Sequence, residues 1–321
     1  MTAASERATA ILDEVERAVI GKRSALTLVL AAVLAKGHVL LEDLPGLGKT
    51  LAARSLATAL GLEFARAQFT PDLLPADLTG SFVFDQRSGD FVFRKGPIFT
   101  ELLLADEINR TPPKTQAALL EAMQERQVTV EGRTFSLGPT FHVLATANPV
   151  EYEGTYPLPE AQLDRFLARV SFGYPSAQDE TDVVIARMRR GREEVDISTA
   201  VAAGELLELQ TTVEQVTVDP GIARYAVALT TATRTHPDTL IGSSPRGSLA
   251  LVLMARAMAV IDGRDYVIPE DVKAVAPSAL AHRVTIRPEL WMTQPSGLAV
   301  VEEVLGQVPT PPTVEPDSVR P

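Results

Sequence analysis

The sequence contains no cysteine, and this absence excludes a disulfide framework as well as a metal site built from thiolates. Long hydrophobic runs are also absent. The longest apolar stretch, residues 25–35, is interrupted by Thr27 and closed by Lys36, so it is much shorter than the ~20 residues of a membrane-spanning helix. Residues 1–17 mix acidic and basic side chains and show no apolar segment followed by a cleavage site, so we expect no secretion signal. We therefore expect a cytoplasmic protein without a membrane span.

Positive charge is scarce, because Lys and Arg number 30 against 41 Asp and Glu, a net charge of −11. Affinity for a phosphate backbone depends on clustered positive charge, so this balance argues against a general nucleic-acid binder, though not against a narrow basic channel formed by assembly. The four histidines, His38, His142, His236 and His282, lack the spacing of metal ligands, and we interpret them as structural. The 45% of apolar residues is enough to bury a core, over a length typical of two domains.

Short apolar runs alternate with helical stretches through the first half of the chain. The runs cover residues 38–42, 63–68, 101–106, 141–146 and 169–174. Such alternation predicts an α/β domain with a mostly parallel, five-stranded sheet. Two further pairs of runs flank turn residues, which predicts two hairpins inserted between the sheet strands. These pairs are 81–84 with 91–94 and 127–130 with 133–137.

The character of the sequence changes after Pro175. From there it is helical and rich in alanine, without a run typical of a buried strand, so it predicts a second, all-helical domain. Residues 309–321 hold five prolines and few large apolar side chains, which is typical of a disordered tail. We place the α/β domain at residues 1–176, the helical domain at 177–308 and the tail at 309–321.

A glycine-bearing loop follows the first apolar run directly and opens a helix. A phosphate-binding loop requires this context, because backbone N–H groups and the positive end of the helix both attract phosphate. Lys49 is expected to reach the β- and γ-phosphates of ATP, and Thr50 to ligate Mg²⁺. The pattern departs from Gly-x-x-x-x-Gly-Lys-Ser/Thr at its first position, where Asp43 replaces glycine. The expected nucleotide-binding residues of the loop are Pro45, Gly46, Leu47, Gly48, Lys49, Thr50 and Leu51.

Polar residues end the third and fourth apolar runs. Asp106 is expected to bind Mg²⁺, often through water, and so to belong to the cofactor site, while Glu107 would orient and polarise the attacking water. Taken alone, two acids after a strand are also common as a helix cap. Asn148 could hydrogen-bond the attacking water or the γ-phosphate, but an asparagine before proline is also an ordinary turn former. Nothing resembles a Ser/His/Asp set or a hydrolase with paired carboxylates.

With these motifs in this order, the sequence resembles the AAA+ ATPases and, within them, the MoxR family. The resemblance runs from about residue 18 to about residue 284. It implies a P-loop core whose five strands lie in the order 5-1-4-3-2, a helical lid with a sensor 2 residue, and a ring that is usually a hexamer. The most specific stretches are residues 69–75, 106–110, 116–123 and 159–166.

In such rings each ATP lies between two subunits, so one site takes residues from two chains. Matching by motif implies that Arg165 is the arginine finger, which reaches a neighbour's γ-phosphate, and that Arg246 is the sensor 2 arginine of the lid. Arg110 is a rival or additional interface arginine. Ile20 and Gly21 resemble the segment that lines the adenine pocket. As alternatives, Arg165 could pair with a neighbouring acid, and Arg246 could simply occupy the first turn of a helix.

Three functions compete at this point. The leading one is an ATP-driven chaperone. The resemblance implies that such a protein matures an enzyme complex or aids metal-cofactor insertion, commonly with a partner that carries a von Willebrand factor A domain. The second is a nucleic-acid motor, but the two hairpins carry nearly balanced charge and do not favour it. The third is a ring that uses ATP as an assembly switch with little turnover, against which the intact acidic pair argues. A magnesium-chelatase-like motor subunit is a close relative of the first.

Overall fold

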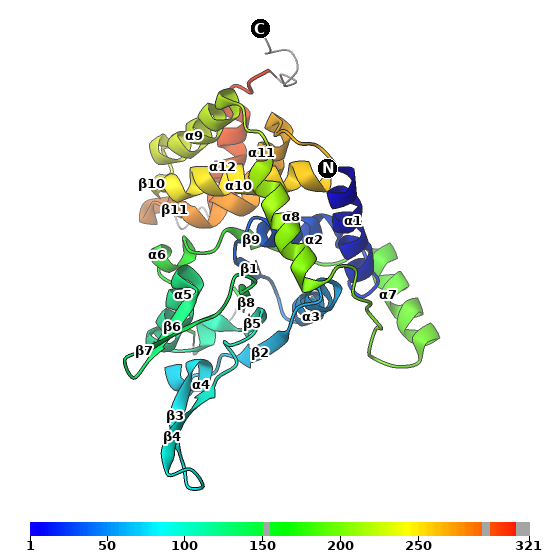
Figure 1. Cartoon of the computed structure of the whole chain (residues 1–321). Coiled ribbons are helices and arrows are strands. Elements are labelled where there is room, and N and C mark those ends of the chain that lie inside the picture. The colour runs from blue at the N-terminus through cyan, green and yellow to red at the C-terminus, as the bar shows by residue number, and fades with distance from the viewer. Residues whose placement is uncertain (150–154, 291–295, 313–321) are drawn as a thin grey trace.

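The computed structural model describes residues 1–149, 155–290 and 296–312. At its centre lies a parallel sheet whose strand order is β2-β5-β8-β1-β9 (Figure 1). Numbered along the chain and read from the other edge, this is the order 5-1-4-3-2, so the predicted topology is confirmed. The strands are β1 (Val39–Glu42), β2 (Phe64–Gln68), β5 (Leu102–Asp106), β8 (His142–Ala147) and β9 (Ala168–Val170).

All neighbouring strands of this sheet run in the same direction. Residues that follow β1, β5 and β8 therefore meet at the carboxyl edge, where ligands bind in open α/β sheets. Residues that precede the strands meet at the opposite, amino edge. The loop after β1 emerges near the middle of the carboxyl edge, because β1 lies between β8 and β9. The predicted site residues are divided between these two edges.

Helices cover both faces of the sheet, because successive side chains of a strand point to opposite sides. In β5, Leu102 and Leu104 belong to a core shared with α1, α2 and α3, whereas Leu103 and Ala105 belong to a second core shared with α5. The helices of this part are α1 (Thr2–Glu16), α2 (Arg23–Leu34), α3 (Lys49–Ala59), α4 (Pro75–Thr79), α5 (Pro113–Glu125) and α6 (Glu160–Leu163). A 3-10 turn, Ile108–Arg110, follows β5.

The longest apolar stretch of the sequence forms α2, which is buried between the sheet and the C-terminal helices. Its burial on several sides explains why it is apolar nearly all round. Among the described residues, no helix is both long and apolar enough to cross a membrane.

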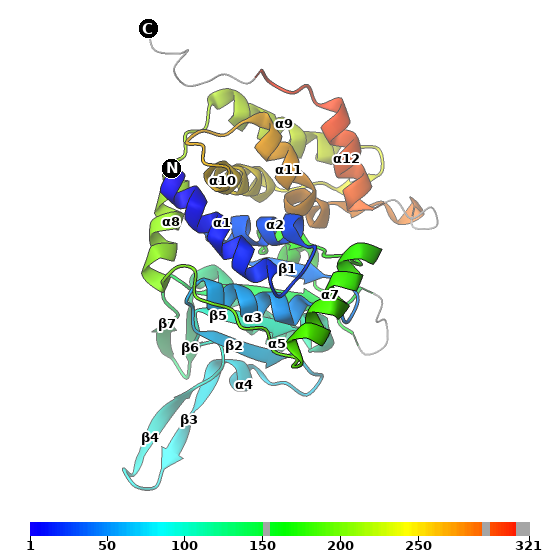
Figure 2. The same ribbon diagram turned by 90° about the vertical axis from the view of Figure 1, so that its right-hand side faces the viewer.

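Both predicted hairpins are present. They are β3 (Gly80–Asp85) with β4 (Asp90–Lys95), and β6 (Gln127–Val130) with β7 (Arg133–Ser136). The first projects from the end of the molecule opposite the C-terminal helices (Figures 1 and 2). Phe93 stacks on Phe135 of the second hairpin with ring centroids 4.2 Å apart. Towards the tip, Phe84 and Phe91 stay 52% and 68% exposed, so only the base of the hairpin packs on the body.

The C-terminal part is built mainly from helices. They are α7 (Ala177–Arg190), α8 (Ala203–Gln215), α9 (Pro220–Thr235), α10 (Pro245–Ile261), α11 (Pro269–Leu280) and α12 (Gly297–Gln307), with 3-10 turns at Ala281–Arg283 and Pro288–Leu290. The expectation of an all-helical domain is wrong in one detail, because β10 (Thr239–Ile241) and β11 (Thr285–Ile286) form a two-stranded antiparallel sheet. Strands of three and two residues are too short to give a sequence pattern.

The C-terminal helices do not form a separate core. Residues of α8, α9, α10, α11 and α12 share one continuous apolar cluster with α1 and α2. The boundary at residue 176 stays a prediction, although α7 begins at Ala177. Of the predicted tail, residues 309–312 are neither helix nor strand, and residues 313–321 lie outside the described part of the chain.

Candidate functional site

The loop after β1 has the backbone of a phosphate cradle. Two of its glycines adopt left-handed conformations, Gly46 at φ +81° and Gly48 at φ +82°. Side chains are rarely tolerated there, so the two glycines are required by conformation. Gly48 is also the N-cap of α3, whose first residue is Lys49. The first backbone N–H groups of α3 are therefore directed at the space above the loop, as anion binding requires.

Asp43, which replaces the first glycine of the motif, has a structural task of its own. Its φ is not in the left-handed region, so glycine is not required at this position. The Asp43 carboxylate accepts backbone N–H groups from Phe172 and, at 3.0 Å, from Gly173. These bonds tie the start of the loop to the segment after β9. They also help to explain why β9 ends at Val170, earlier than the predicted run, because the following N–H groups bond to a side chain instead of a strand.

The Lys49 side chain bridges two strand ends. Its Nζ donates to the backbone oxygen of Asp43 at 2.5 Å and lies 3.4 Å from that of Ala147, the last residue of β8. Burial lowers the pKa of the Lys49 ammonium, while the negative charges of Asp43 and Asp106 act in the opposite direction. The cation is thus held at the middle of the carboxyl edge, above the phosphate cradle.

Asp106 and Thr50 supply oxygen atoms suited to a magnesium ion. The Thr50 hydroxyl donates to Asp106 Oδ2 at 3.5 Å, so the two predicted metal ligands face each other across the edge of the sheet. The other carboxylate oxygen, Oδ1, accepts the Thr146 hydroxyl at 2.6 Å. Hydroxyl and carboxylate oxygens are the donors that Mg²⁺ prefers. Because the protein supplies only a small number of ligands here, room is left for the waters and phosphates that Mg²⁺ keeps. The residues present therefore fit a magnesium–nucleotide site.

Glu107 is held in a strained backbone conformation, with φ +58° and ψ +49°. Non-glycine residues adopt this region uncommonly, and such strain clusters at functional sites. The conformation is fixed by the Glu107 N–H, which donates to the Thr146 hydroxyl at 2.8 Å. The side chain accepts from Gln68 Nε2 at 2.6 Å and lies 3.4 Å from Arg110 Nη1. Thr146 thus aligns both acids, a role that was not predicted from the sequence, although this threonine ends the fourth apolar run.

Two side chains of the edge strand β2 also reach the acidic pair. Arg66 contacts Asp106 Oδ2 through Nε at 2.9 Å and through Nη2 at 2.7 Å. Arg66 Nη2 also donates to Gln68 Oε1 at 2.7 Å, and Gln68 in turn contacts Glu107. Sequence reasoning missed both residues. The available signal was their spacing of two, which places them on one face of a strand next to β5.

The remaining residues expected on the nucleotide side lie nearby. Asn148 is buried directly after β8, and its backbone oxygen accepts from Asn109 Nδ2 at 3.2 Å. Val19, the residue before Ile20, is the nearest neighbour of Gly48 outside the loop. Gly21 adopts φ +72° and packs against Asp179 of α7, where a Cβ would not fit. These contacts place the expected adenine segment beside the loop, and its role stays a prediction.

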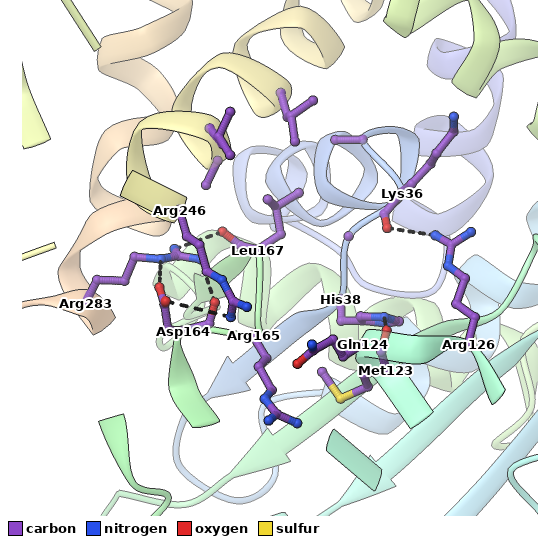
Figure 3. Close-up of a pocket in the computed structure, with 15 residues that line it drawn as sticks. Lys36, His38, Met123, Gln124, Arg126, Asp164, Arg165, Leu167, Arg246 and Arg283 are labelled. Atoms are coloured by element: carbon purple, nitrogen blue, oxygen red, sulfur yellow. Dashed lines mark hydrogen bonds and ion pairs between the residues drawn. The ribbon is translucent and has the colours of Figure 1, made fainter. Parts of the chain in front are cut away.

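A cavity of about 340 Å³ opens at the amino edge of the sheet, opposite the loop after β1 (Figure 3). Arg165 and Arg246 both line it, together with residues at the end of α2 and the start of α10. Asp164 is held there by Arg283, whose Nε donates to its Oδ1 at 2.8 Å and whose side chain is only 3% exposed. This buried pair joins the C-terminal helices to the segment before β9 and was not anticipated from the sequence.

The two predicted arginines are placed differently within this cavity. Arg246, in the first turn of α10, approaches Asp164 Oδ2 to 3.9 Å and is 52% exposed, so its ion pair is loose. Figure 3 shows Arg165 directed away from this cluster, although it follows Asp164 in the chain. Its guanidinium has no hydrogen bond or ion pair to any described residue in the structure. The alternative that Arg165 pairs with its neighbouring acid is therefore not supported, because Asp164 is bound by Arg283 instead.

Among the described residues, no group of three or more His, Cys, Asp or Glu side chains is placed to hold a metal ion. Burial lowers the pKa of His38 to about 3 and that of His142 to about 4. His38 Nδ1 accepts the backbone N–H of Val143 at 2.9 Å, so its ring is neutral with the proton on Nε2. These two side chains connect β1, β8 and the helices around them, as their structural interpretation requires.

Comparison with known proteins identifies the relatives of this chain. Residues 38–168 match the sequence model of the ATPase family associated with various cellular activities, and residues 231–304 match that of the AAA lid domain. Protein YeaC of Bacillus subtilis is 48% identical over 96% of each chain. Chaperone MoxR1 of Mycobacterium tuberculosis is 42% identical over 93% of this chain and 81% of the relative. A crystal structure from Cytophaga hutchinsonii, described as an ATPase, superimposes with a TM-score of 0.89 and 38% identity, covering 97% of each chain.

Proposed function

The chain belongs to the MoxR family of AAA+ ATPases, and from this premise we propose that it hydrolyses ATP at sites shared between subunits of a ring and uses the energy to remodel or mature a client protein complex. The carboxyl edge of the sheet provides one half of such a site. The amino edge provides the other. The separation of these two halves within one chain is the observation that carries the proposal.

Nucleotide binding falls to the loop after β1. Its backbone N–H groups and the start of α3 hold the phosphates, and Lys49 leaves the two backbone oxygens that it now contacts to reach them. Thr50 and Asp106 would hold the magnesium ion that accompanies ATP, and that ion would supply positive charge to offset the phosphates and polarise the bond to be broken. Ile20 and Gly21 contribute to the adenine side.

Hydrolysis needs a group that orients and polarises a water molecule. Glu107 is that group in our proposal, because it is half-exposed, next to the metal ligand Asp106, and fixed in its backbone by Thr146. Asn148, at the end of the neighbouring strand, supports the same water or the γ-phosphate. Gln68 and Arg110 contact Glu107, so they set where its carboxylate points.

Arg165 and Arg246 complete the site of a neighbouring chain. Both line the cavity at the amino edge, whereas Lys49 and Glu107 lie at the carboxyl edge of the same parallel sheet. Because the two guanidinium groups and the phosphate loop lie at opposite edges, we propose that the target of the arginines belongs to a second copy. A repeated contact between the two different edges is head-to-tail and closes into a ring when the rotation permits. We propose a hexamer on the family resemblance.

The client side of the proposal rests on the family and on the β3–β4 hairpin. Its exposed Phe84 and Phe91 are available for contact with another protein. A chaperone of this type works on an enzyme complex, in some cases aiding metal-cofactor insertion, with a von Willebrand factor A domain protein as the partner. We place this activity in the cytoplasm.

The test is the rate of ATP hydrolysis per subunit, measured over a wide range of protein concentrations. If sites form between copies, the rate per subunit rises with concentration and reaches a plateau as assembly saturates. Light scattering on the same samples should show the assembled state over the same range. A substantial rate that is independent of concentration, from particles that remain monomeric, would refute the shared site.

A further inference from the structure

Arg66 places a cation on the carboxylate that the metal ion is expected to use. Two of its nitrogens, Nε and Nη2, contact a single oxygen, Asp106 Oδ2. This is also the oxygen that faces the Thr50 hydroxyl. The Asp106 side chain is only 10% exposed, so the ion pair is screened less than one at the surface.

Arg66 is held in this position from a second direction. Its Nη2 donates to Gln68 Oε1, and the two residues project from the same face of the edge strand β2. The Arg66 side chain is nevertheless 46% exposed, so solvent lies next to it. A flexible side chain at the open edge of a sheet can swing outwards without moving the backbone.

We propose that Arg66 is the resident counter-cation of Asp106 in the metal-free protein and that it must leave Asp106 Oδ2 before Mg²⁺ can bind there. The inference rests on the proposed nucleotide site and adds a control on its metal loading. The reason is that Nε and Nη2 of Arg66 both lie against Oδ2 and take its two accepting positions, so a metal ion, or a water bound to it, reaches this oxygen only when the guanidinium moves away. The other oxygen, Oδ1, accepts the Thr146 hydroxyl, so Oδ2 is the oxygen that faces Thr50, the other predicted metal ligand.

This arrangement predicts how Arg66 changes the dependence of nucleotide binding on magnesium. Without metal, the Arg66 charge offsets that of Asp106, which would otherwise repel the phosphates of ADP. With metal, Arg66 competes for the same oxygen. Removing its charge therefore weakens metal-free binding and favours metal binding, and both effects increase the ratio of the ADP dissociation constant without Mg²⁺ to that with Mg²⁺.

The experiment is calorimetry of ADP binding to the full chain in EDTA and in excess MgCl₂. For Arg66→Gln we expect the ratio of dissociation constants to exceed that of the wild type by about tenfold. Arg66→Lys should fall between them, since lysine keeps the charge but cannot present two nitrogens to one oxygen in the same fixed geometry. Arg94→Gln, at an exposed position on β4, is the matched control and should leave the ratio unchanged.

Three results would overturn the inference. If Arg66→Gln weakens ADP binding equally with and without Mg²⁺, Arg66 acts on the nucleotide directly and does not leave Asp106 for the metal. An unchanged ratio with unchanged affinities would show that the ion pair does not compete with the metal. If the wild-type chain binds no ADP under either condition, the proposed function fails together with this inference, whereas normal wild-type binding confines the failure to Arg66.

Discussion

At the scale of single residues, Thr146 links the chemistry of the site to its backbone. Its hydroxyl donates to Asp106, the last residue of β5, and accepts from the N–H of Glu107, the next residue, so a single side chain of β8 aligns the predicted metal ligand and the acid that we propose activates water. The left-handed conformation of the Glu107 backbone costs about 1–3 kcal/mol, and the surrounding hydrogen bonds must offset this cost. Such strain is expected where position matters more than stability.

The role of Glu107 is tested by Glu107→Gln. Glutamine keeps the size and shape of the glutamate side chain, so the variant should fold normally, but its amide cannot accept a proton from water. We expect ATP binding to stay near the wild-type affinity while steady-state turnover falls by at least about 100-fold. Turnover is measured by phosphate release and binding by calorimetry. Glu121→Gln, at an exposed position on α5, is the control, and near-normal turnover of Glu107→Gln would remove Glu107 from this role.

At the scale of elements, the loop after β1 depends on glycine where α3 begins. Gly48→Ala forces a Cβ into a left-handed N-cap, so we expect the free energy of unfolding to fall by about 1–2 kcal/mol. Gly306 is a matched control, because it lies inside α12 with open space where a Cβ would be added. Gly306→Ala should stabilise the protein by about 0.4–1 kcal/mol. Urea unfolding measures both, and equal effects of the two substitutions would contradict this conformational account.

The pair His38 and His142 makes the strands around β1 sensitive to acid. The folded protein holds both rings neutral, with pKa values of about 3 and about 4, whereas the unfolded chain protonates them below about pH 6.5. The unfolded state therefore binds more protons in this window. The free energy of unfolding should fall by about 2–4 kcal/mol between pH 7 and pH 5.

Urea titrations at pH 7, 6 and 5 check this expectation. In His142→Gln the fall with pH should be roughly halved, because one of the two neutral rings is gone while a polar side chain remains for Gly37 and Gln210. A stability that is level from pH 7 to pH 5 in the wild type would show that these rings do not govern acid sensitivity.

Sequence patterns predicted some elements better than others for physical reasons. The sheet order and both hairpins were predictable, because β-strand runs, turn residues and family motifs are local signals. The β10–β11 pair was not, since its strands are too short to show a period. The ion pairs of Arg66 and Arg283 could not be found either, because the partners Asp106 and Asp164 lie 40 and 119 residues away in the chain, and the spacing of Arg66 and Gln68 indicates only a shared strand face. Asp43 departs from the motif in the sequence, and only its contacts with the segment after β9 explain its presence.

At the scale of the whole molecule, the parallel sheet separates the two groups of residues that we propose to form one shared site. Asp106 ends a strand, Lys49 and Glu107 follow strands, and Arg165 precedes one, so a single chain presents them at opposite edges. Arg246, from the C-terminal helices, lines the same cavity as Arg165, so in our proposal both arginines serve a neighbouring chain. If the ring forms as proposed, a change in the angle between those helices and the sheet would move these arginines relative to the neighbour's nucleotide.

The shared site is tested most directly by mixing two inactive variants. Lys49→Ala should lose nucleotide binding, and Arg165→Ala should bind ATP but hydrolyse it at least about 100-fold more slowly. When the two are mixed, an Arg165→Ala chain keeps an intact loop, and an adjacent Lys49→Ala chain still offers its arginine. We predict that the mixture regains ATP turnover. A mixture of Lys49→Ala with Glu107→Gln should stay inactive, because both lesions lie in the same half of the site. If neither mixture regains turnover although both pairs assemble, Arg165 does not act on a neighbouring chain.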